Sequence, residues 1–325
     1  MDFNYLKHKW YLALFSPLLL IPPISYAHLF NISNLNPDTK ISQVALLGAH
    51  DAGTYGIEKL EDFTVTQNMG LLEQADLGVR YFDIRVRKEG EHWYFYHGEK
   101  SKLCNGFTNY RYNALVIVRN LVSYAVHHPQ DLFILKLHFD ETANSSKEIY
   151  NFINDILYSG GHGYSEHFIT HDNSNTKYLG GATLQNTVLK GHNIAILSNH
   201  IGEEASVKLA NIVWDYKSNT NTKWGATVDA HKLIKTLKNN LLTRNPDKIT
   251  ISQTNFPGIS PQELRMPGLR KVARENHAIV ASALENDPNW HGIISIDFVG
   301  NCELSSTKTY LDMINAYNKG LVHKK

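Results

Sequence analysis

Two ionisable residues stand together at the end of an apolar run, in the stretch "LLGAHDAGTYG". His50 and Asp51 end a segment that otherwise reads as a buried strand, and the small residues Ala52 and Gly53 follow at once. An imidazole has an unperturbed pKa of about 6.5, so it can take or give a proton near neutral pH. The pattern therefore indicates acid–base chemistry at the end of a strand.

A second stretch, "VRYFDIRV" at residues 79–86, alternates between apolar and polar side chains. Because side chains alternate across a strand, Asp83 and Arg85 share one face and three apolar side chains share the other. In a barrel the apolar face packs against the surrounding helices, so we expect Asp83 and Arg85 to point inward. In "DLFILKLHF" the same parity puts Lys136 and His138 on one face.

His97, which ends "HWYFYH", and Asp297, in "IISIDFVG", also fall near the ends of predicted strands. Alone, each polar group has a structural explanation, such as a buried ion pair between Asp83 and Arg85. Together, two imidazoles, a guanidinium and carboxylates at one barrel mouth suit metal-free phosphoryl transfer. One imidazole removes a proton from the attacking hydroxyl, the other protonates the leaving oxygen, and the guanidinium stabilises the charged phosphate oxygens.

Eight strand candidates alternate with helical patterns along the chain. This order predicts an α/β fold, a single (β/α)8 TIM-like barrel of irregular form. The strands are expected at residues 44–50, 79–86, 92–97, 131–139, 192–198, 211–216, 248–253 and 292–299. Helices are expected at residues 113–127, 146–157, 228–242, 262–286 and 308–318. The polar stretches 171–177 and 217–223 read as surface loops, and since no linker divides residues 28–325, we expect one domain there.

The first 27 residues resemble a secretory signal peptide. Lys7 and Lys9 precede an apolar run, and "SYA" supplies small residues before a cleavage site after Ala27. A membrane anchor is the alternative, but prolines interrupt the run, which is shorter than the roughly 20 residues that span a bilayer. We therefore expect a secreted or periplasmic protein.

Composition sets further limits. The chain has 325 residues, a net charge of +1 and interspersed acids and bases, which argues against nucleic acid as a partner. Its two cysteines, Cys104 and Cys302, can form a disulfide in an exported protein or remain free thiols. The sequence has no Cys/His spacing typical of a metal site.

The stretches "LLGAHDAGTYG", "GVRYFDIRVR" and "WYFYHG", in this order, resemble the X-domain of bacterial phosphatidylinositol-specific phospholipase C. That family's pattern runs roughly G-[TA]-H-D-S-G, then R-x-F-D-I-R, then a strand that ends in H-G. "IISIDFVG" is similar to the strand that carries the family's last catalytic aspartate. The resemblance spans about residues 42–299, with weaker motifs beyond residue 139, and Ala52 departs from the family's usual serine.

The resemblance implies a role for each matching histidine. His50 would be the general base, oriented by Asp297, and His97 would be the general acid, with Asp51 as its partner. In the implied reaction the inositol 2-hydroxyl attacks phosphorus, diacylglycerol leaves, and a cyclic inositol phosphate forms. Water then opens the ring slowly.

The resemblance also implies that Arg85 stabilises the phosphate, and Asp83 matches the aspartate two residues before the family's arginine. The calcium-dependent eukaryotic relatives carry an acidic residue at this arginine, so the expected enzyme needs no metal and no cofactor. Lys136 or His138 is a candidate contact to the substrate. Asp215, in "VWDYK", resembles an inositol-binding aspartate.

The expected partner is a phosphatidylinositol headgroup, free or in a glycosyl-phosphatidylinositol anchor, at a membrane that a monomer contacts transiently. In the loop "TNFPGIS", Phe256 and Ile259 either face the bilayer or, as the alternative, Phe256 is buried. Two other functions stay open. One is a metal-dependent phosphodiesterase of the glycerophosphodiester type, and the other is a non-catalytic barrel that binds inositol headgroups or glycans.

Overall fold

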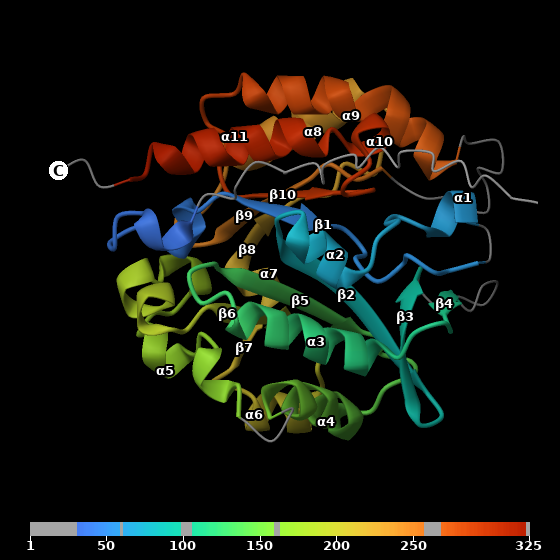
Figure 1. Ribbon diagram of the computed structural model, residues 1–325, viewed down its shortest axis with the longest axis vertical. Coiled ribbons are helices and arrows are strands. Elements are labelled where there is room, and N and C mark those ends of the chain that lie inside the picture. Colours follow the sequence, from blue (N-terminus) through green and yellow to red (C-terminus); the bar gives the residue numbers. More distant parts are fainter. Residues whose placement is uncertain (1–30, 59–60, 99–105, 159–162, 257–267, 323–325) are drawn as a thin grey trace, which may run out of the picture.

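The computed structural model describes residues 31–58, 61–98, 106–158, 163–256 and 268–322 (Figure 1). Eight parallel strands follow one another around a curled sheet in the order β7, β6, β5, β2, β1, β10, β9, β8. Their bounds are β1 Leu46–Ala49, β2 Val79–Glu89, β5 Phe133–Phe139, β6 Ile194–Ser198, β7 Val213–Asp215, β8 Thr220–Thr222, β9 Ile249–Gln253 and β10 Ile293–Ile296. Within the described part of the chain no pairing joins β7 to β8, so the barrel is open there. The predicted α/β barrel is confirmed, in an irregular and half-open form.

Residues 92–97 form a strand, β3 (His92–His97), but it is not one of the barrel strands. β2 is 11 residues long, extends beyond the barrel and turns back at Gly90, whose φ of +61° suits glycine. β3 therefore pairs antiparallel with β2, and β4 (Phe107–Asn109) pairs with β3 to complete a ribbon. The prediction of a parallel strand here is wrong, because hydrophobic periodicity carries no information on strand direction.

The missing barrel strand is β8, which lies in the stretch predicted as a surface loop at residues 217–223. It pairs in parallel with β9. Its sequence, Thr-Asn-Thr, has no apolar residue, and its polar groups are satisfied by hydrogen bonds. Thr220 Oγ1 donates to the carbonyl oxygen of Tyr216 at 2.8 Å, and Asn221 Nδ2 donates to that of Asn245 at 2.8 Å. A search for apolar alternation could not find such a strand.

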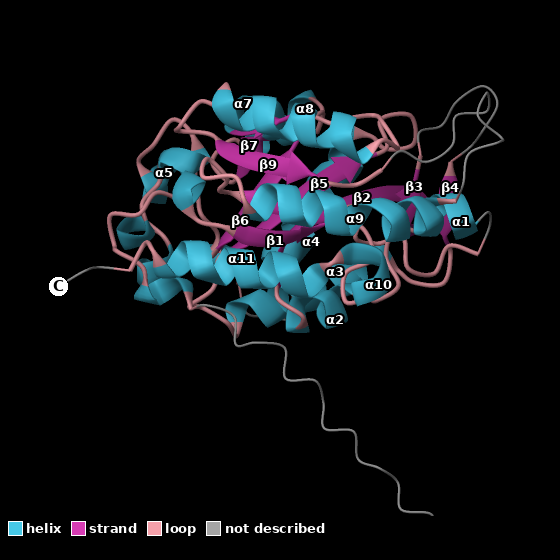
Figure 2. Ribbon diagram, turned by 90° about the horizontal axis from the view of Figure 1, so that it is seen from above, coloured by secondary structure: helices cyan, strands magenta, loops and turns pink. Residues whose placement is uncertain are grey.

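Helices cover the outside of the sheet. The longer ones are α3 (Ala114–Val126), α4 (Ser146–Leu157), α8 (Ala230–Leu242), α9 (Leu269–Glu285) and α11 (Thr307–Lys319), and they confirm the five predicted helices. The shorter ones are α1 (Glu61–Thr64), α2 (Leu71–Asp76), α5 (His171–Ser174), α6 (Glu203–Lys208), α7 (Tyr216–Asn219) and α10 (Cys302–Ser305). Figure 1 shows α8, α9 and α11 on one side of the sheet and α3, α4 and α6 on the other. Seen from above in Figure 2, α9 and α11 lie side by side over the strands.

Strand alternation divides the core into two parts. Phe82 and Ile84 of β2 are fully buried against the helices outside the sheet, whereas Tyr81 points into the barrel. Full burial of a large apolar side chain contributes roughly 1.5–3 kcal/mol. Apolar side chains from residues 32–41 and 179–188 close the interior at the amino-terminal end of the strands. The carboxyl ends remain as the open mouth, toward which the interior face of β2 continues with polar residues.

Some predictions lie outside the described residues. They concern the signal peptide with its cleavage site, Cys104 and residues 262–267 of the fourth predicted helix. Export and the state of the two cysteines therefore stay predictions, as does the domain boundary at residue 28. In the described part of the chain, no helix combines the length and the apolar character that crossing a membrane requires.

Candidate active site

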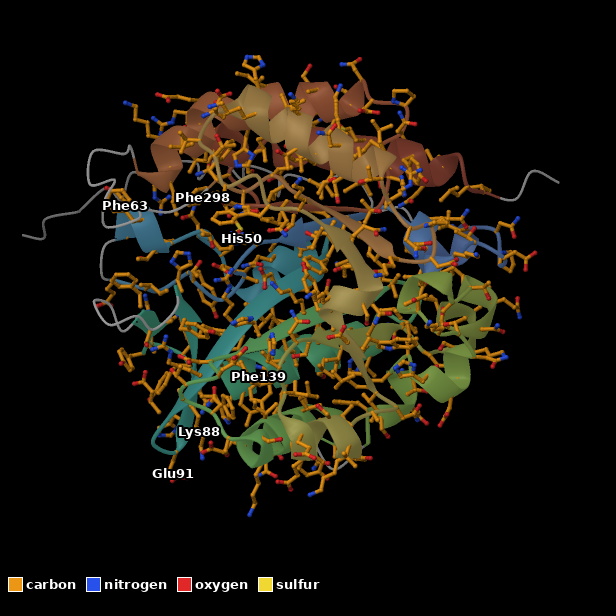
Figure 3. The ribbon with its side chains drawn as sticks, turned by 180° about the vertical axis from the view of Figure 1, so that it is seen from behind. His50, Phe63, Lys88, Glu91, Phe139 and Phe298 are labelled. Atoms are coloured by element: carbon orange, nitrogen blue, oxygen red, sulfur yellow. The ribbon has the colours of Figure 1, made fainter. Side chains whose placement is uncertain are left out.

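His50 directly follows β1, and its backbone N–H donates to the carbonyl oxygen of Ile296 in the neighbouring β10 at 3.0 Å. Asp297 directly follows β10, so the parallel register places the two side chains together. His50 Nδ1 lies 2.8 Å from Asp297 Oδ1. The carboxylate accepts from Nδ1–H, which leaves Nε2 as the nitrogen that can exchange a proton. Lys88 and Glu91 lie at the tip of the β2–β3 ribbon, and Figure 3 shows His50 well away from both of them.

Asp51 is buried between both imidazoles and a guanidinium. Its Oδ2 lies 3.2 Å from His97 Nε2 and 3.6 Å from His50 Nε2, and its other oxygen pairs with Arg85 Nε. The backbone at Asp51 has a φ of +41°, a left-handed conformation that aspartate adopts more readily than most residues. Neighbouring residues of a regular strand point to opposite faces. The turn therefore allows both residues 50 and 51 to reach the mouth.

Two buried residues that the sequence did not reveal, Thr66 and Gln67, hold this turn. Thr66 Oγ1 donates to the carbonyl oxygens of His50 and Asp51, at 3.1 and 3.2 Å. Gln67 Nε2 donates to the carbonyl oxygens of His50 and Ile296, at 2.9 and 3.0 Å, and so ties the ends of β1 and β10 together. Both residues lie in an irregular segment, where polar residues give no sign of burial.

Gly53 explains how the ribbon reaches the mouth. A Cβ atom on Gly53 would overlap the ring of Phe95, so only glycine lets β3 pack directly on the turn. β3 runs back along β2 toward the barrel, and His97 at its end contacts Asp51. His97 thus reaches the predicted site, although its strand is antiparallel to β2 and a parallel strand was predicted.

The interior face of the mouth is polar, as strand parity predicts. Asp83 lies opposite Lys136 and Arg85 lies opposite His138 across β2 and β5. Asp83 Oδ1 lies 2.8 Å from Lys136 Nζ, which in turn lies 4.9 Å from the centre of the Tyr216 ring. Tyr216 was not predicted, although it directly follows Asp215 in the stretch singled out from the sequence.

The two imidazoles differ in their proton affinity. Burial would lower the pKa of His50, but the carboxylates of Asp51 and Asp297 outweigh it and hold that pKa above its ordinary value. For His97, burial dominates, and Arg85 adds to it, so the pKa is lowered despite the nearby Asp51. In the free protein the imidazole proton is therefore favoured on His50 rather than on His97.

The buried carboxylates differ as well. Burial raises the pKa of Asp297, and His50 only partly offsets this effect. Burial would also raise the pKa of Asp83, but the cations of Lys136 and Arg85 outweigh it and hold that pKa well below its usual range. Asp83 and Lys136 therefore form a permanent ion pair beside the two imidazoles.

A pocket of about 390 Å³ opens at the mouth. Its polar lining comprises His50, Asp51, Thr66, Arg85, His97, Gln253 and Asn255, and its apolar lining comprises Trp224, Phe256 and Leu269. Trp224 is 49% exposed, whereas Phe256 is only 2% exposed. Of the two alternatives for Phe256, exposure toward a bilayer is therefore wrong and burial is confirmed. Ile259 lies outside the described residues.

Three of the predicted residues also have the spacing of a metal site. His50, Asp51 and Asp83 offer ligand atoms that all lie within 4.8 Å of one another. However, Asp51 is paired with the Arg85 guanidinium, and Asp83 is paired with the Lys136 ammonium. Two cations of the chain itself thus neutralise the carboxylates that a metal ion would need.

The structure does not bring Asp215 to this mouth. Asp215 is exposed, accepts a hydrogen bond from the backbone N–H of Ser218 at 2.7 Å, and lines a separate pocket of about 550 Å³ with His200. Its neighbour Trp214 points into the barrel, and adjacent residues of a strand point to opposite faces. Asp215 therefore points away from the barrel interior, and it does not lie where the predicted contact with a substrate at the mouth would require it.

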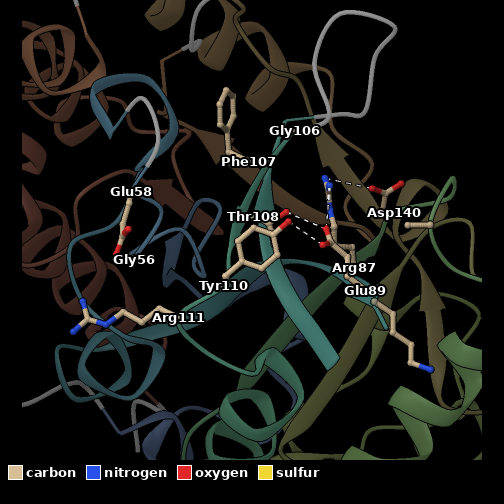
Figure 4. Close-up of a pocket in the computed structure, with 12 residues that line it drawn as sticks. Gly56, Glu58, Arg87, Glu89, Gly106, Phe107, Thr108, Tyr110, Arg111 and Asp140 are labelled. Atoms are coloured by element: carbon tan, nitrogen blue, oxygen red, sulfur yellow. Dashed lines mark hydrogen bonds and ion pairs between the residues drawn. The ribbon is translucent and has the colours of Figure 1, made fainter. Parts of the chain in front are cut away.

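A larger pocket, of about 860 Å³, lies beside the β2–β4 ribbon (Figure 4). Some of its charged groups pair with neighbouring residues of the lining. Arg87 lies 3.4 Å from Asp140, and Glu89 accepts hydrogen bonds from Thr108 and Tyr110. The described residues that line it include none of the predicted catalytic residues. The smaller mouth pocket, with two imidazoles and a guanidinium, is therefore the candidate active site.

No protein-family model matches the sequence, and no curated protein matches it. Solved structures do match. A fluorinated variant of the phosphatidylinositol-specific phospholipase C of Staphylococcus aureus has a TM-score of 0.64 and 16% identity, over 87% of this chain and 96% of that one. The enzyme of Listeria monocytogenes has a TM-score of 0.61 and 17% identity, over 88% of this chain and 97% of that one. This chain therefore has the barrel fold of the bacterial phosphatidylinositol-specific phospholipases C.

Proposed function

We propose that this protein is a metal-independent phospholipase C, which cleaves phosphatidylinositol or its glycosylated form to diacylglycerol and inositol 1,2-cyclic phosphate. One observation carries the proposal. The Asp51 carboxylate lies within 3.6 Å of Nε2 of both His50 and His97 and also pairs with Arg85. Two imidazoles around a guanidinium are the groups that phosphoryl transfer requires when no metal takes part. The fold shared with bacterial phosphatidylinositol-specific phospholipases C supports this reading.

In the proposed reaction His50 is the general base. Its Nε2 takes the proton of the inositol 2-hydroxyl while the oxygen forms a bond to phosphorus. Asp297 holds the Nδ1–H and stabilises the imidazolium that results. The bond from phosphorus to the diacylglycerol oxygen breaks, and His97 gives its proton to that oxygen. Water then opens the cyclic phosphate with the two roles exchanged.

Arg85 takes the place of a metal in this scheme. Its guanidinium is charged at all relevant pH values and can donate to two phosphate oxygens at once. The side chain is 24% exposed and lines the mouth pocket, so a bound phosphate can meet it. Lys136, Asp83 and Tyr216, farther along the interior face, offer donors and acceptors for a polyol ring.

The protonation state of the free protein is the reverse of the one that turnover needs. The pKa of His50 is raised and that of His97 is lowered, so a neutral base with a protonated acid is the less populated of the two singly protonated arrangements. A phosphodiester bound beside Arg85 adds a negative charge, which raises the pKa of His97. We expect kcat/KM to depend on pH along a bell-shaped curve whose two limbs belong to the coupled pair.

Cleavage of the proposed substrate releases diacylglycerol, a lipid alcohol. The apolar lining of the pocket supports a lipid substrate. Trp224 is 49% exposed at the rim and lies on the same pocket as the imidazoles. One of the matching Staphylococcus aureus structures concerns the modulation of that enzyme's membrane binding. We propose a monomer that is exported through the first 27 residues and contacts the bilayer transiently through this rim.

The test measures release of inositol 1,2-cyclic phosphate from phosphatidylinositol vesicles in excess EDTA. The parent protein should be active, and His50→Ala and His97→Ala should each reduce kcat by at least about 10²-fold, the scale of general acid–base catalysis. His231→Ala, which changes an exposed histidine of α8, should keep the parental rate. A near-parental rate in either mouth variant would contradict the assigned roles.

A metal-dependent phosphodiesterase is the second candidate, because His50, Asp51 and Asp83 have the spacing of a metal site. Activity that disappears in EDTA and returns with a divalent cation would favour it. Binding of phosphatidylinositol without turnover under either condition would instead identify a non-catalytic barrel.

A further inference from the structure

Asn255 is a buried residue of the mouth that neither the sequence motifs nor the proposed reaction uses. It is 3% exposed and stands two residues beyond β9. The preceding residue, Thr254, fixes its position, because the backbone N–H and Oγ1 of Thr254 both donate to the carbonyl oxygen of Ser295, at 3.0 and 3.1 Å. Ser295 lies two residues before Asp297. The neighbouring ends of β9, β10 and β1 thus present Asn255, Asp297 and His50 in one row.

The Asn255 amide faces the reactive edge of His50. Asn255 Nδ2 lies 3.4 Å from His50 Nε2, and both residues line the mouth pocket. In the described part of the chain, Asn255 Oδ1 is buried and has no hydrogen-bond partner. An unsatisfied buried carbonyl oxygen destabilises a fold, so the amide is held here at the expense of stability.

The position of the amide matters because His50 Nε2 has two neighbours with opposite effects. Asp51 Oδ2, at 3.6 Å, favours the form in which Nε2 carries a proton. An amide N–H directed at Nε2 favours the form with a lone pair, since a lone pair accepts that hydrogen bond. Asn255 therefore opposes Asp51 at the same nitrogen.

We propose that Asn255 is a positioning residue that holds the Nε2 edge of His50, as Asp297 holds the Nδ1 edge. The amide keeps the lone pair of the neutral ring directed into the mouth. The inference rests on the proposed function only in taking Nε2 as the nitrogen that exchanges a proton with the substrate.

Other charged or titratable groups also act on His50. They are Asp51 on its own turn, Asp297 after β10, Asp83 and Arg85 on β2, and His97 on β3. The test leaves all of them unchanged and varies Asn255 alone. Asn255→Ala removes the amide, and Asn255→Asp replaces it with a carboxylate of nearly the same shape. Gln253→Ala is the matched control, because Gln253 lines the same pocket but donates to Thr222 Oγ1 at 2.6 Å.

The primary measurement is the pKa of His50 in the substrate-free full chain, followed by NMR with ¹⁵N-labelled histidine and assigned by the signal lost in His50→Ala. Loss of one net hydrogen bond to the neutral form should raise this pKa by about 0.4 to 1 unit in Asn255→Ala. Asn255→Asp should raise it further, because a carboxylate then faces Nε2. Gln253→Ala should leave it unchanged. In parallel, kcat of Asn255→Ala should fall about 3- to 10-fold while KM changes little.

An unchanged His50 pKa in both Asn255 variants, or a lower pKa in Asn255→Ala, would overturn the proposal. If Asn255→Ala does not fold, the test rests on the near-isosteric Asn255→Asp alone, and the direction in which it shifts the pKa of His50 gives the result. The titration needs no substrate, so its outcome is separate from that of the proposed function. If the protein releases no cyclic inositol phosphate but the pKa of His50 shifts as expected in the Asn255 variants, the proposed phospholipase activity is refuted and the positioning role of Asn255 is retained.

Discussion

The Asp51 carboxylate lies 3.2 Å from His97 Nε2, although residue 97 ends a strand that runs against the direction of the barrel. Because β2 extends beyond the barrel and β3 returns along it, a residue outside the eight-stranded path reaches the same mouth as His50. The proposed base thus comes from the barrel and the proposed acid from the antiparallel ribbon. Both depend on one buried carboxylate.

Removing the charge of Asp297 should weaken the proposed base. Its carboxylate raises the pKa of His50, so Asp297→Asn should lower that pKa. Because the pKa of His50 lies above that of His97 in the free protein, the alkaline limb of the kcat/KM profile should move to lower pH. The substituted amide can also favour the wrong tautomer of His50, so kcat should fall by at least about 10²-fold. A pH profile measured against that of Asp312→Asn, a surface change on α11, checks both effects. An alkaline limb that does not move would show that Asp297 does not control His50.

Breaking the buried pair of Lys136 with Asp83 should destabilise the fold. Lys136→Met leaves a buried carboxylate without its nearest cation, which costs about 3–5 kcal/mol. Since the pKa of Asp83 is lowered in the folded protein, the contribution of this pair is present above about pH 4, the ordinary value for aspartate, and is lost at lower pH. Urea unfolding at pH 7 and at low pH should show the larger loss at pH 7. Asp83→Leu combined with Lys136→Met should recover much of it, and a loss below about 1 kcal/mol at pH 7 would contradict this account.

Adding one methyl group at Gly53 should separate the ribbon from the turn. The Cβ of Gly53→Ala would overlap the Phe95 ring, so β3 must shift and carry His97 away from Asp51. We expect a loss of about 1–3 kcal/mol in the free energy of unfolding and a fall in kcat that exceeds any change in KM. Phe95→Leu in the same chain should restore part of both quantities. Full activity in Gly53→Ala would mean that the position of β3 does not matter for His97.

Trp224 should affect the reaction at a membrane more than the reaction in solution. Trp224→Ala removes an exposed aromatic side chain from the rim, and we expect the rate on phosphatidylinositol vesicles to fall about 5- to 30-fold, the factor for 1–2 kcal/mol. The rate on a short-chain substrate below its micelle concentration should change much less. Tyr158→Ala is the control for an exposed aromatic residue away from the mouth, because Tyr158 is the C-cap of α4. Equal losses on both substrates would place Trp224 in contact with the reacting headgroup instead.

Part of this site follows from the sequence because it depends on local geometry. Alternation along a strand is a property of the backbone itself, so the inward direction of Asp83 and Arg85, and of Lys136 opposite Asp83, could be read from the order of residues. The same holds for helix α3, whose predicted start at Asn113 is its N-cap, with Oδ1 accepting from the backbone N–H of Leu115 at 3.0 Å.

Other features depend on contacts between distant segments, which no local pattern records. The direction of β3 follows from the length of β2, and β8 is a strand only because β9 supplies its hydrogen bonds. The amide of Asn255 meets His50 across 205 positions of sequence, and it does so because three neighbouring strands end at one level. Residue types and their spacing thus determine which groups face the interior. Closure of the sheet sets which of them touch, because that depends on the packing of the whole chain.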